Sequence, residues 1–425
     1  MEDGAYQRTV LPNGLRVLTA SLPHTRSVAV SIYVGAGSRY ETDEKAGLSH
    51  FVEHLCFKGT ERRPTPREVS EVIDSVGGVI NAGTDRELTV YYCKVGRPHF
   101  ELALDVLTDL LRHPLFAPDE VEKERQVVLE ELAMVADFPV QQVDVLLDET
   151  LWPGEPLGRD VAGSEASVRS LSREMAVDYL GRQYVANNTV VSVAGAVSHE
   201  EAVDRVADVL GNWPRGEPGS WFPSVNGQAA PRAALKYKAT EQAHLSLAVR
   251  GLPLRHPDRY ALSLLSVLLG EGMSSRLVME LRERRSLCYD VHSYVNYFLD
   301  TGAFAVYVGV DPSRAQEALC ALLEELTRLR DDGAAEEELA RAKELAKGRL
   351  LLRMEDTRAV SDWMGAQELL TGDIRTVDEV TELIDAVTVE ELRRVAQQLL
   401  VSEQLNLAVV GPFRSDRRFV SLLHL

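Results

Sequence analysis

Three residues in the segment His50-Phe51-Val52-Glu53-His54 have side-chain types and a spacing that can do chemistry. His50 and His54 are four residues apart, so on a helix both imidazoles point the same way and Glu53 lies beside that face. Two imidazoles can hold a divalent metal, and a nearby carboxylate that is not a ligand can take a proton from the attacking water. This H-x-x-E-H pattern therefore indicates metal-assisted hydrolysis.

The residues around the motif favour a helix over residues 46–57, because this stretch has no proline and its apolar side chains share one face. These apolar residues are Leu48, Phe51, Val52 and Leu55. Two histidines and a glutamate inside such a helix need polar partners or a metal. The alternative is a purely structural role for the motif, which is rarely a chance match in a chain with ten histidines.

Length and composition indicate a soluble protein of several domains. The chain has 425 residues, too many for one typical domain, and 45% of them are hydrophobic and 26% charged. No apolar run approaches the roughly 20 residues that span a bilayer, and residues 1–14 resemble neither a signal peptide nor a transit peptide. The net charge of −19 argues against nucleic acids and anionic membranes as partners.

The four cysteines, at positions 56, 93, 288 and 320, are scattered and show no CxxC spacing. This arrangement indicates neither a disulfide framework nor a cysteine zinc site. Reduced thiols are expected, which favours a cytoplasmic location.

The chain repeats itself once, at an offset of 216 residues. Expected strands over 28–34 and 245–249 lead to Gly35 and Gly251, and strands over 190–194 and 405–410 lead to Gly195 and Gly411. The pair at 90–91 matches the pair at 306–307 in the same way. Three anchors with one spacing predict two homologous domains. We expect a domain over 1–212, a linker rich in proline and glycine over 213–232, and a second domain over 233–425.

Within each half, strands are followed by clustered helices, expected over 98–111, 119–135, 312–329 and 335–353, which indicates an α+β fold. The positions that correspond to His50, Glu53 and His54 in the second half are Ser266, Leu269 and Gly270. The second domain therefore keeps the scaffold but cannot bind a metal in this way.

A catalytic zinc site needs a third protein ligand. The helix expected over 119–135 carries Glu124 and Glu131 on or beside an apolar stripe that contains Val121 and Val128. Carboxylates on a core-facing stripe are costly unless they are paired or bind a metal. The alternative is a helix with a solvated acidic flank, and the residues alone leave both interpretations open.

The stretches GAGSRYETDEKAGLSHFVEHLCFKGTERR and LPNGLRV resemble the M16 family of zinc peptidases, which includes pitrilysin, insulin-degrading enzyme and mitochondrial processing peptidase. In that family H-x-x-E-H is followed after about 76 residues by a ligand Glu, which is the spacing of Glu131 from His54. The resemblance implies that His50, His54 and Glu131 bind Zn²⁺, that Glu53 is the general base and that Glu124 is a supporting acidic residue. It also implies two LuxS/MPP-like metallohydrolase domains, in agreement with the repeat.

Two further elements resemble the family. Arg282 and Tyr289 in LRERRSLCYDV match an Arg–Tyr pair that contacts the substrate or the tetrahedral intermediate, although a basic run such as this one is usually a solvated face. The segment GVINAGT, with Asn81 and Ala82, resembles an edge strand that binds an extended peptide through backbone hydrogen bonds. Asn81 as a turn residue is the alternative.

The resemblance as a whole implies a short-form, M16B-like zinc endopeptidase, similar to the β subunit of mitochondrial processing peptidase and to bacterial short forms. Such an enzyme hydrolyses peptides or unstructured segments inside a closed chamber. At half the length of the four-domain relatives, the chain is expected to act as a homodimer in which the Arg–Tyr pair comes from the partner subunit. A heterodimer with an inactive paralogue is an alternative.

The competing class is a non-catalytic subunit that binds presequences or serves as a scaffold. Members of that kind typically lose metal ligands, whereas this sequence retains all of them. Hydrolysis of a non-peptide substrate is also compatible with the motif.

Overall fold

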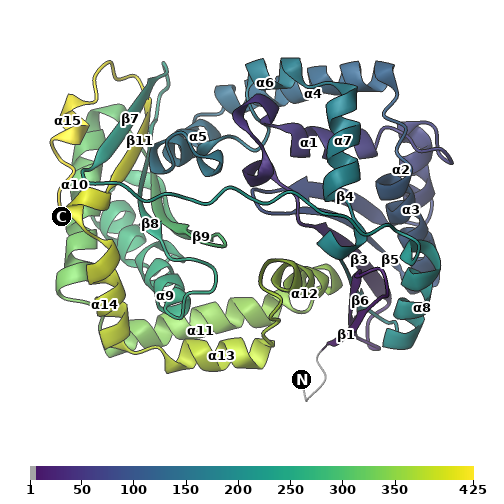
Figure 1. Cartoon of the computed structure of the whole chain (residues 1–425). Coiled ribbons are helices and arrows are strands. Elements are labelled where there is room, and N and C mark those ends of the chain that lie inside the picture. Colours follow the sequence, from purple (N-terminus) through teal and green to yellow (C-terminus); the bar gives the residue numbers. More distant parts are fainter. Residues whose placement is uncertain (1–5) are drawn as a thin grey trace. The chain divides into compact units, whose positions relative to one another are not determined.

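The computed structural model describes residues 6–425, so the first five residues of the expected N-terminal domain lie outside the described part. The chain forms two compact units, each with one mixed β-sheet covered by helices (Figure 1). The predicted α+β fold with two homologous domains is confirmed. The first unit comprises the described residues up to Leu132, Asp160–Phe222 and Leu351–Thr376, and the second comprises Ala133–Arg159, Pro223–Leu350 and Val377–Leu425.

The sheet of the first unit has six strands in the order β1-β2-β6-β3-β5-β4. Their bounds are β1 (Gln7–Val10), β2 (Arg16–Ser21), β6 (Thr189–Gly195), β3 (Ser27–Val34), β5 (Thr89–Gly96) and β4 (Val79–Thr84). Only β2 and β6 pair in parallel; the other neighbours are antiparallel. Strand β4 therefore has one edge without a partner strand.

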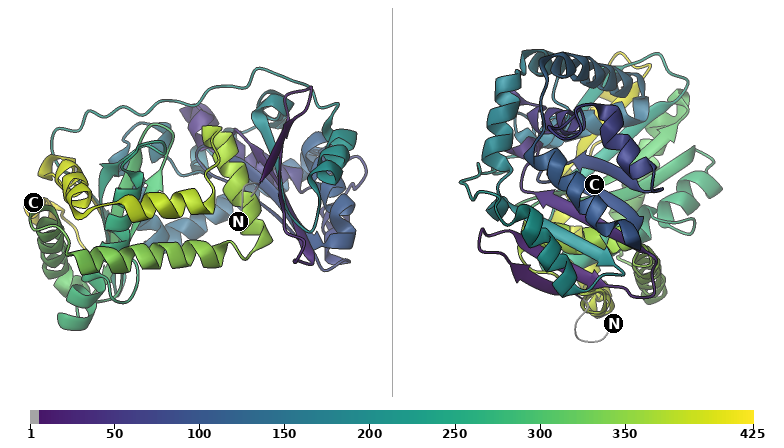
Figure 2. Two further views of the ribbon diagram at one scale, coloured as in Figure 1. Left: turned by 90° about the horizontal axis from the view of Figure 1, so that it is seen from below. Right: turned by 90° about the vertical axis from the view of Figure 1, so that its right-hand side faces the viewer.

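One face of this sheet is covered by α3 (Phe100–Arg112) and α8 (His199–Leu210) (Figure 2). Val30 and Ile32 of β3 and Leu104 and Leu107 of α3 belong to the same buried core. This core extends to the helix that bears the H-x-x-E-H motif. The unit also contains α1 (Leu48–Cys56), α2 (Pro66–Asp74), α6 (Glu165–Ser170), α7 (Arg173–Gln183) and the first part of α4 (Pro118–Asp137).

The sheet of the second unit has five strands in the order β7-β11-β8-β10-β9. The bounds are β7 (Arg232–Tyr237), β11 (Asn406–Gly411), β8 (Ala243–Gly251), β10 (Gly302–Val310) and β9 (Cys288–Tyr297). Its helices are α9 (Arg259–Gly270), α10 (Ala315–Asp331), α11 (Glu336–Arg353), α13 (Val377–Ala386), α14 (Val389–Leu399) and α15 (Arg417–Val420), with a π-helical turn at Val278–Arg284.

The second face of each sheet is covered by a helix from the other half of the chain. Helix α12 (Thr357–Thr371) packs on β3 and β6 of the first sheet, and α5 (Pro139–Leu151) packs on β8 and β11 of the second. A Cβ atom on Gly365 would lie 2.4 Å from ring carbons of Tyr33, so only glycine permits the close approach of α12. Both units are therefore assembled from segments of both halves of the chain.

The two exchanged helices make equivalent polar contacts. Ser31 Oγ donates to Asp362 Oδ1 of α12 at 3.4 Å, and Ser246 Oγ donates to Asp144 Oδ1 of α5 at 3.3 Å. Ser31 and Ser246 thus occupy equivalent positions 215 residues apart, not 216 as the sequence repeat predicts. The difference matters because a shift of one residue moves every side chain of a strand to the opposite face.

The predicted strands and long helices are otherwise present, with ends within a few residues of the expected ones. In the segment predicted as a linker, Phe222 N donates to Arg39 O at 3.1 Å, and the Arg39 guanidinium lies 4.3 Å from the ring centroid of Trp221. Among residues 6–425, no helix is both long and apolar enough to cross a bilayer.

Candidate metal centre

The H-x-x-E-H motif lies on α1, and a buried carboxylate determines where this helix begins. Glu41 accepts hydrogen bonds from Gly47 N at 2.8 Å, from Ser49 N at 2.5 Å and from Ser49 Oγ at 2.5 Å. The first N–H groups of a helix have no partner within the helix, and a negative charge there also interacts favourably with the helix dipole. Glu41 therefore fixes the start of the helix that presents the motif.

Gly47 immediately precedes α1 and has a left-handed backbone conformation with φ of 90°. A Cβ atom at this position would lie 2.4 Å from Ala162 O, so the close approach of the 162–163 segment also requires glycine. The predicted apolar side of the helix is confirmed, because Leu48, Phe51, Val52 and Leu55 are all buried.

The structure brings together the three predicted metal ligands from α1 and α4. His50 Nε2 and His54 Nε2 lie 3.2 Å apart. Glu131 Oε2 lies 3.8 Å from the first of these nitrogens and 3.6 Å from the second. Within residues 6–425 this is the one group of three or more His, Cys, Asp or Glu side chains whose ligand atoms all approach one another within 4.8 Å.

These distances suit zinc. Ligand bonds of about 2.0–2.1 Å in tetrahedral geometry place neighbouring ligand atoms about 3.4 Å apart, and the three observed separations lie close to that value. Two imidazoles and one carboxylate form a donor set that catalytic zinc sites use, and such a set leaves a fourth position free. The residues present therefore fit a zinc ion.

Glu124, the second predicted carboxylate of α4, contacts a ligand rather than the cluster itself. Its Oε2 lies 3.1 Å from His54 Nδ1, and its Oε1 lies 2.7 Å from Lys58 Nζ. A carboxylate on the far nitrogen of a metal-binding histidine fixes its tautomer and ring orientation. With the Glu124 side chain only 4% exposed, the ion pair with Lys58 also compensates a buried charge.

Glu53, the predicted general base, is 9% exposed and accepts a hydrogen bond from Thr84 Oγ1 to its Oε2 at 2.5 Å. Burial raises the pKa of Glu53, and the hydrogen bond from Thr84 opposes this effect. The buried base is thus held by the last residue of β4.

The two histidines differ in their electrostatic surroundings. Burial, with the neighbouring charge of His54, lowers the pKa of His50 to about 4. Burial also acts to lower the pKa of His54, but the hydrogen bond with Glu124 and the charges of nearby carboxylates outweigh it, so the pKa is raised. Nδ1 of His50 is buried and has no hydrogen-bond partner among the described residues.

Arg282 and Tyr289 lie in the second unit. Arg282 is in the π-helical turn and Tyr289 is in β9. The guanidinium carbon of Arg282 lies 4.9 Å from the ring centroid of Tyr289, and the tyrosine is 79% exposed. The two residues therefore form a contacting, accessible pair, as their spacing in the sequence predicts.

Asn81 and Ala82 lie within the edge strand β4 and not in a turn. The register pairs Asn81 with Tyr92 and Ala82 with Tyr91 of β5. The outer edge of β4 is the side on which an extended peptide could add a strand, so the role predicted for these two residues remains a prediction.

Sequence reasoning missed three residues of this site: Glu41, Lys58 and Thr84. Lys58 is four residues after His54, a helical spacing that places both on one side of α1 and its C-terminal turn. Thr84 is two residues after Ala82, so the alternation of a strand directs both side chains to the same face. The sequence offers no comparable signal for Glu41.

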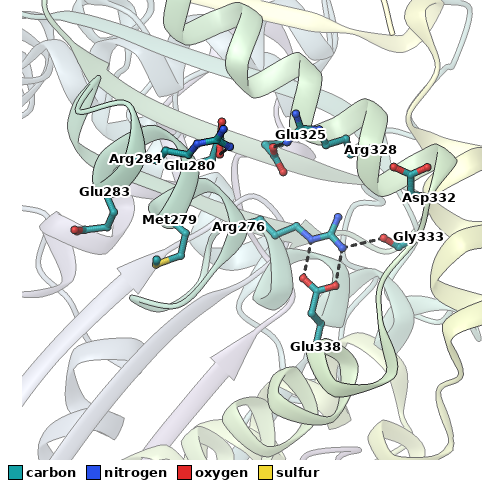
Figure 3. Close-up of a pocket in the computed structure, with 10 residues that line it drawn as sticks. All are labelled: Arg276, Met279, Glu280, Glu283, Arg284, Glu325, Arg328, Asp332, Gly333 and Glu338. Atoms are coloured by element: carbon teal, nitrogen blue, oxygen red, sulfur yellow. Dashed lines mark hydrogen bonds and ion pairs between the residues drawn. The ribbon is translucent and has the colours of Figure 1, made fainter.

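The second unit contains a separate polar cavity of about 680 Å³. Figure 3 shows the Arg276 side chain within it, held by two hydrogen bonds to Glu338 and by one to Gly333 O. The cavity is lined by Arg276, Met279, Glu280, Glu283, Arg284, Glu325, Arg328, Asp332, Gly333 and Glu338. None of these ten is a predicted site residue.

Comparison with known proteins agrees with the geometry. The family model described as Insulinase (Peptidase family M16) matches residues 16–165, and the one described as Peptidase M16 inactive domain matches residues 170–345. An uncharacterized zinc protease of Mycobacterium leprae (strain TN) is 38% identical over 419 residues, covering 96% of this chain and 92% of the relative. The uncharacterized zinc protease YmxG of Bacillus subtilis (strain 168) is 36% identical over 408 residues, covering 96% and 98%.

Solved structures share the fold at lower identity. A protease from Helicobacter pylori superposes with a TM-score of 0.89 at 24% identity, over 96% of this chain and 99% of that chain. A structure described as a peptidase M16 inactive domain from Pseudomonas fluorescens gives 0.88 at 19% identity, with the same coverage. Family models that match most of the sequence, and relatives matched nearly from end to end, confirm the predicted family: the chain belongs to peptidase family M16.

Proposed function

We propose that this chain is a zinc-dependent endopeptidase that hydrolyses peptides or unstructured segments. The observation that carries the proposal is the convergence of the donor atoms of His50, His54 and Glu131 beside the buried carboxylate of Glu53. Two relatives of similar length, named zinc proteases, support it.

In this proposal His50, His54 and Glu131 hold the zinc ion, and Glu124 orients His54 through Nδ1. A zinc ion bound there supplies Lewis-acid chemistry, which polarises the scissile carbonyl and makes water a stronger acid. Glu53 takes the proton from the attacking water and later passes it to the leaving amine. A non-catalytic presequence-binding or scaffold subunit is not favoured, because ligands and base are all retained.

The proposal assigns Arg282 and Tyr289 to the substrate. A guanidinium and a phenol are suitable hydrogen-bond donors for a peptide carbonyl and for the oxyanion that develops from it. We propose that the chain acts as a cytoplasmic homodimer with a closed chamber, in which this pair reaches the metal site of the partner subunit. The exposure of Tyr289 supports a role in contacts outside its own unit.

The test is cleavage of unstructured peptides by the purified chain, followed by mass spectrometry, with and without a chelator. Chelation should abolish cleavage, and added Zn²⁺ should restore it. Glu53→Gln should abolish cleavage while the protein retains about one zinc per chain, because the change removes the base and keeps both histidines. Glu44→Gln is the matched control, since Glu44 is an exposed glutamate shortly before α1.

Two results would contradict the proposal. Full peptidase activity in Glu53→Gln would exclude Glu53 as the base. Loss of zinc from Glu53→Gln would instead make Glu53 a metal ligand and would require a different base.

A further inference from the structure

Thr84 occupies a place that the family assignment does not explain. It is the last residue of β4 and pairs with Thr89 of β5. Its hydroxyl lies 2.5 Å from Glu53 Oε2. Ile80 and Ala82, which precede it at alternate positions, pack against the core that contains α1. The strand therefore directs the Thr84 side chain to the helix that bears the base.

The direction of this hydrogen bond follows from the neighbouring hydroxyl. Thr89 Oγ1 donates its single proton to Ala36 O at 2.9 Å, and its oxygen lies 3.5 Å from Thr84 Oγ1. An ionised carboxylate can only accept. The hydroxyl proton of Thr84 is consequently directed to Glu53.

Two properties make this contact suited to positioning. Threonine is restricted at χ1 by its branched β-carbon, so the hydroxyl is held on the strand rather than free to rotate away. The contact engages Oε2 of Glu53 and leaves Oε1 for proton transfer. Because Asn81 and Ala82 lie on the same short strand, the base is tied to the edge that is proposed to receive the peptide.

We propose that Thr84 is a positioning residue for the general base: its hydroxyl holds Oε2 of Glu53, so that Oε1 meets the attacking water when a peptide lies along β4. The inference rests on the proposed peptidase function and deepens it. A base that is displaced by about 1 Å loses up to about 100-fold in rate, because proton transfer needs the productive geometry.

The experiment compares Thr84→Val, which keeps the shape and removes the hydroxyl, with Thr84→Ser, which keeps the hydroxyl. The matched control is Thr9→Val on β1, at the opposite edge of the same sheet, where the lost partner is His199 Nε2 at 2.8 Å. For each zinc-loaded variant, kcat and KM are measured on a quenched fluorescent peptide, together with zinc content and unfolding temperature.

Thr84→Val should lower kcat about 10–100-fold, with KM within about twofold of wild type and zinc content unchanged. Thr84→Ser should recover most of kcat, and Thr9→Val should have nearly wild-type kcat. A purely structural role for Thr84 would instead raise KM and lower the unfolding temperature, without selective rescue by serine. That result, or wild-type kcat in Thr84→Val, would overturn the inference.

A double variant separates this inference from the proposed function. In the Glu53→Gln background, Thr84→Val should cause no further loss of the residual rate, because both changes act through one group. An equal further loss would show that Thr84 acts independently of Glu53. If wild type fails to cleave or Glu53→Gln stays active, the proposed function fails; if Glu53→Gln is inactive and Thr84→Val is not, only the role of Thr84 fails.

A crystal structure of Thr84→Val gives a readout that does not depend on activity. Glu53 should leave its single position, or occupy more than one rotamer, while His50 and His54 keep theirs. An unchanged Glu53 side chain would contradict the positioning role.

Discussion

Replacing Glu41 by glutamine tests whether a side chain outside the motif determines the stability of the metal-binding helix. The two backbone donors, Gly47 N and Ser49 N, bind different oxygens of the Glu41 carboxylate. An amide has only one oxygen, so in Glu41→Gln one N–H group must face an NH₂ group. The shape of the side chain is otherwise unchanged.

The magnitude follows from these contacts. A buried donor left without an acceptor costs about 1–3 kcal/mol, and loss of the negative charge at the helix N-terminus costs a further ~0.3–1 kcal/mol. We therefore expect a destabilisation of about 1.5–4 kcal/mol. For a unit of this size this corresponds to a fall in unfolding temperature of about 3–15 °C.

The assay is differential scanning calorimetry of the metal-free chain, with circular dichroism as a second probe. Glu44→Gln is the control, because Glu44 is exposed and close to Glu41 in sequence, and its unfolding temperature should stay within about 1 °C of wild type. An equally small change in Glu41→Gln would refute the reasoning, because it would show that the carboxylate contributes nothing at the start of α1.

Three further predictions concern the ligands, a buried carboxyl and the subunit arrangement. Glu131→Gln should strip most of the zinc, since a neutral amide is a poor zinc ligand, whereas Glu124→Gln should weaken zinc affinity or activity only about 10–100-fold; competition with a chromogenic chelator measures both, and the opposite order would mean that the two roles are exchanged. Burial raises the pKa of Asp144 above its ordinary value of 3.8 despite the opposing contacts from Ser246 and Tyr294. The folded chain therefore binds this proton more tightly than the unfolded chain, so wild-type stability falls as pH rises from 3.8 through the folded pKa, and Asp144→Asn should match wild type in strong acid and exceed it in unfolding temperature at neutral pH; a difference that does not depend on pH would contradict the assignment. Mixing inactive Glu53→Gln with inactive Tyr289→Phe chains under subunit exchange should restore some cleavage, because one site of the mixed dimer combines an intact base with an intact tyrosine. An inactive mixture, or an active monomer by light scattering, would exclude action in trans.

Local periodicity was sufficient for much of the fold and for half of the site. Apolar residues at helical spacing around the motif predict α1, and that helix places His50 and His54 on one side because they are four residues apart. The repeated strands and glycines predict two homologous domains, since each repeat must build its own sheet. The residues alone left the third ligand open, and only resemblance to M16 peptidases singled out Glu131.

The remaining features depend on contacts between residues far apart in the sequence. Nothing in the pattern of α5 or α12 indicates that each covers the sheet formed mainly by the other half of the chain, because an amphipathic helix specifies that it buries a face and not which sheet it covers. The offset of 215 rather than 216 for β8 likewise emerges only when the covered faces are compared.

The sequence by itself determined which groups could bind a metal and which helix carries two of them. Only the tertiary structure decided that Glu131 converges on both imidazoles, that Glu124 binds His54 together with Lys58, and that Thr84 holds the base. The physical reason is that a buried charge needs a partner at hydrogen-bond distance, and the chain meets this need with whichever side chain the packing brings there.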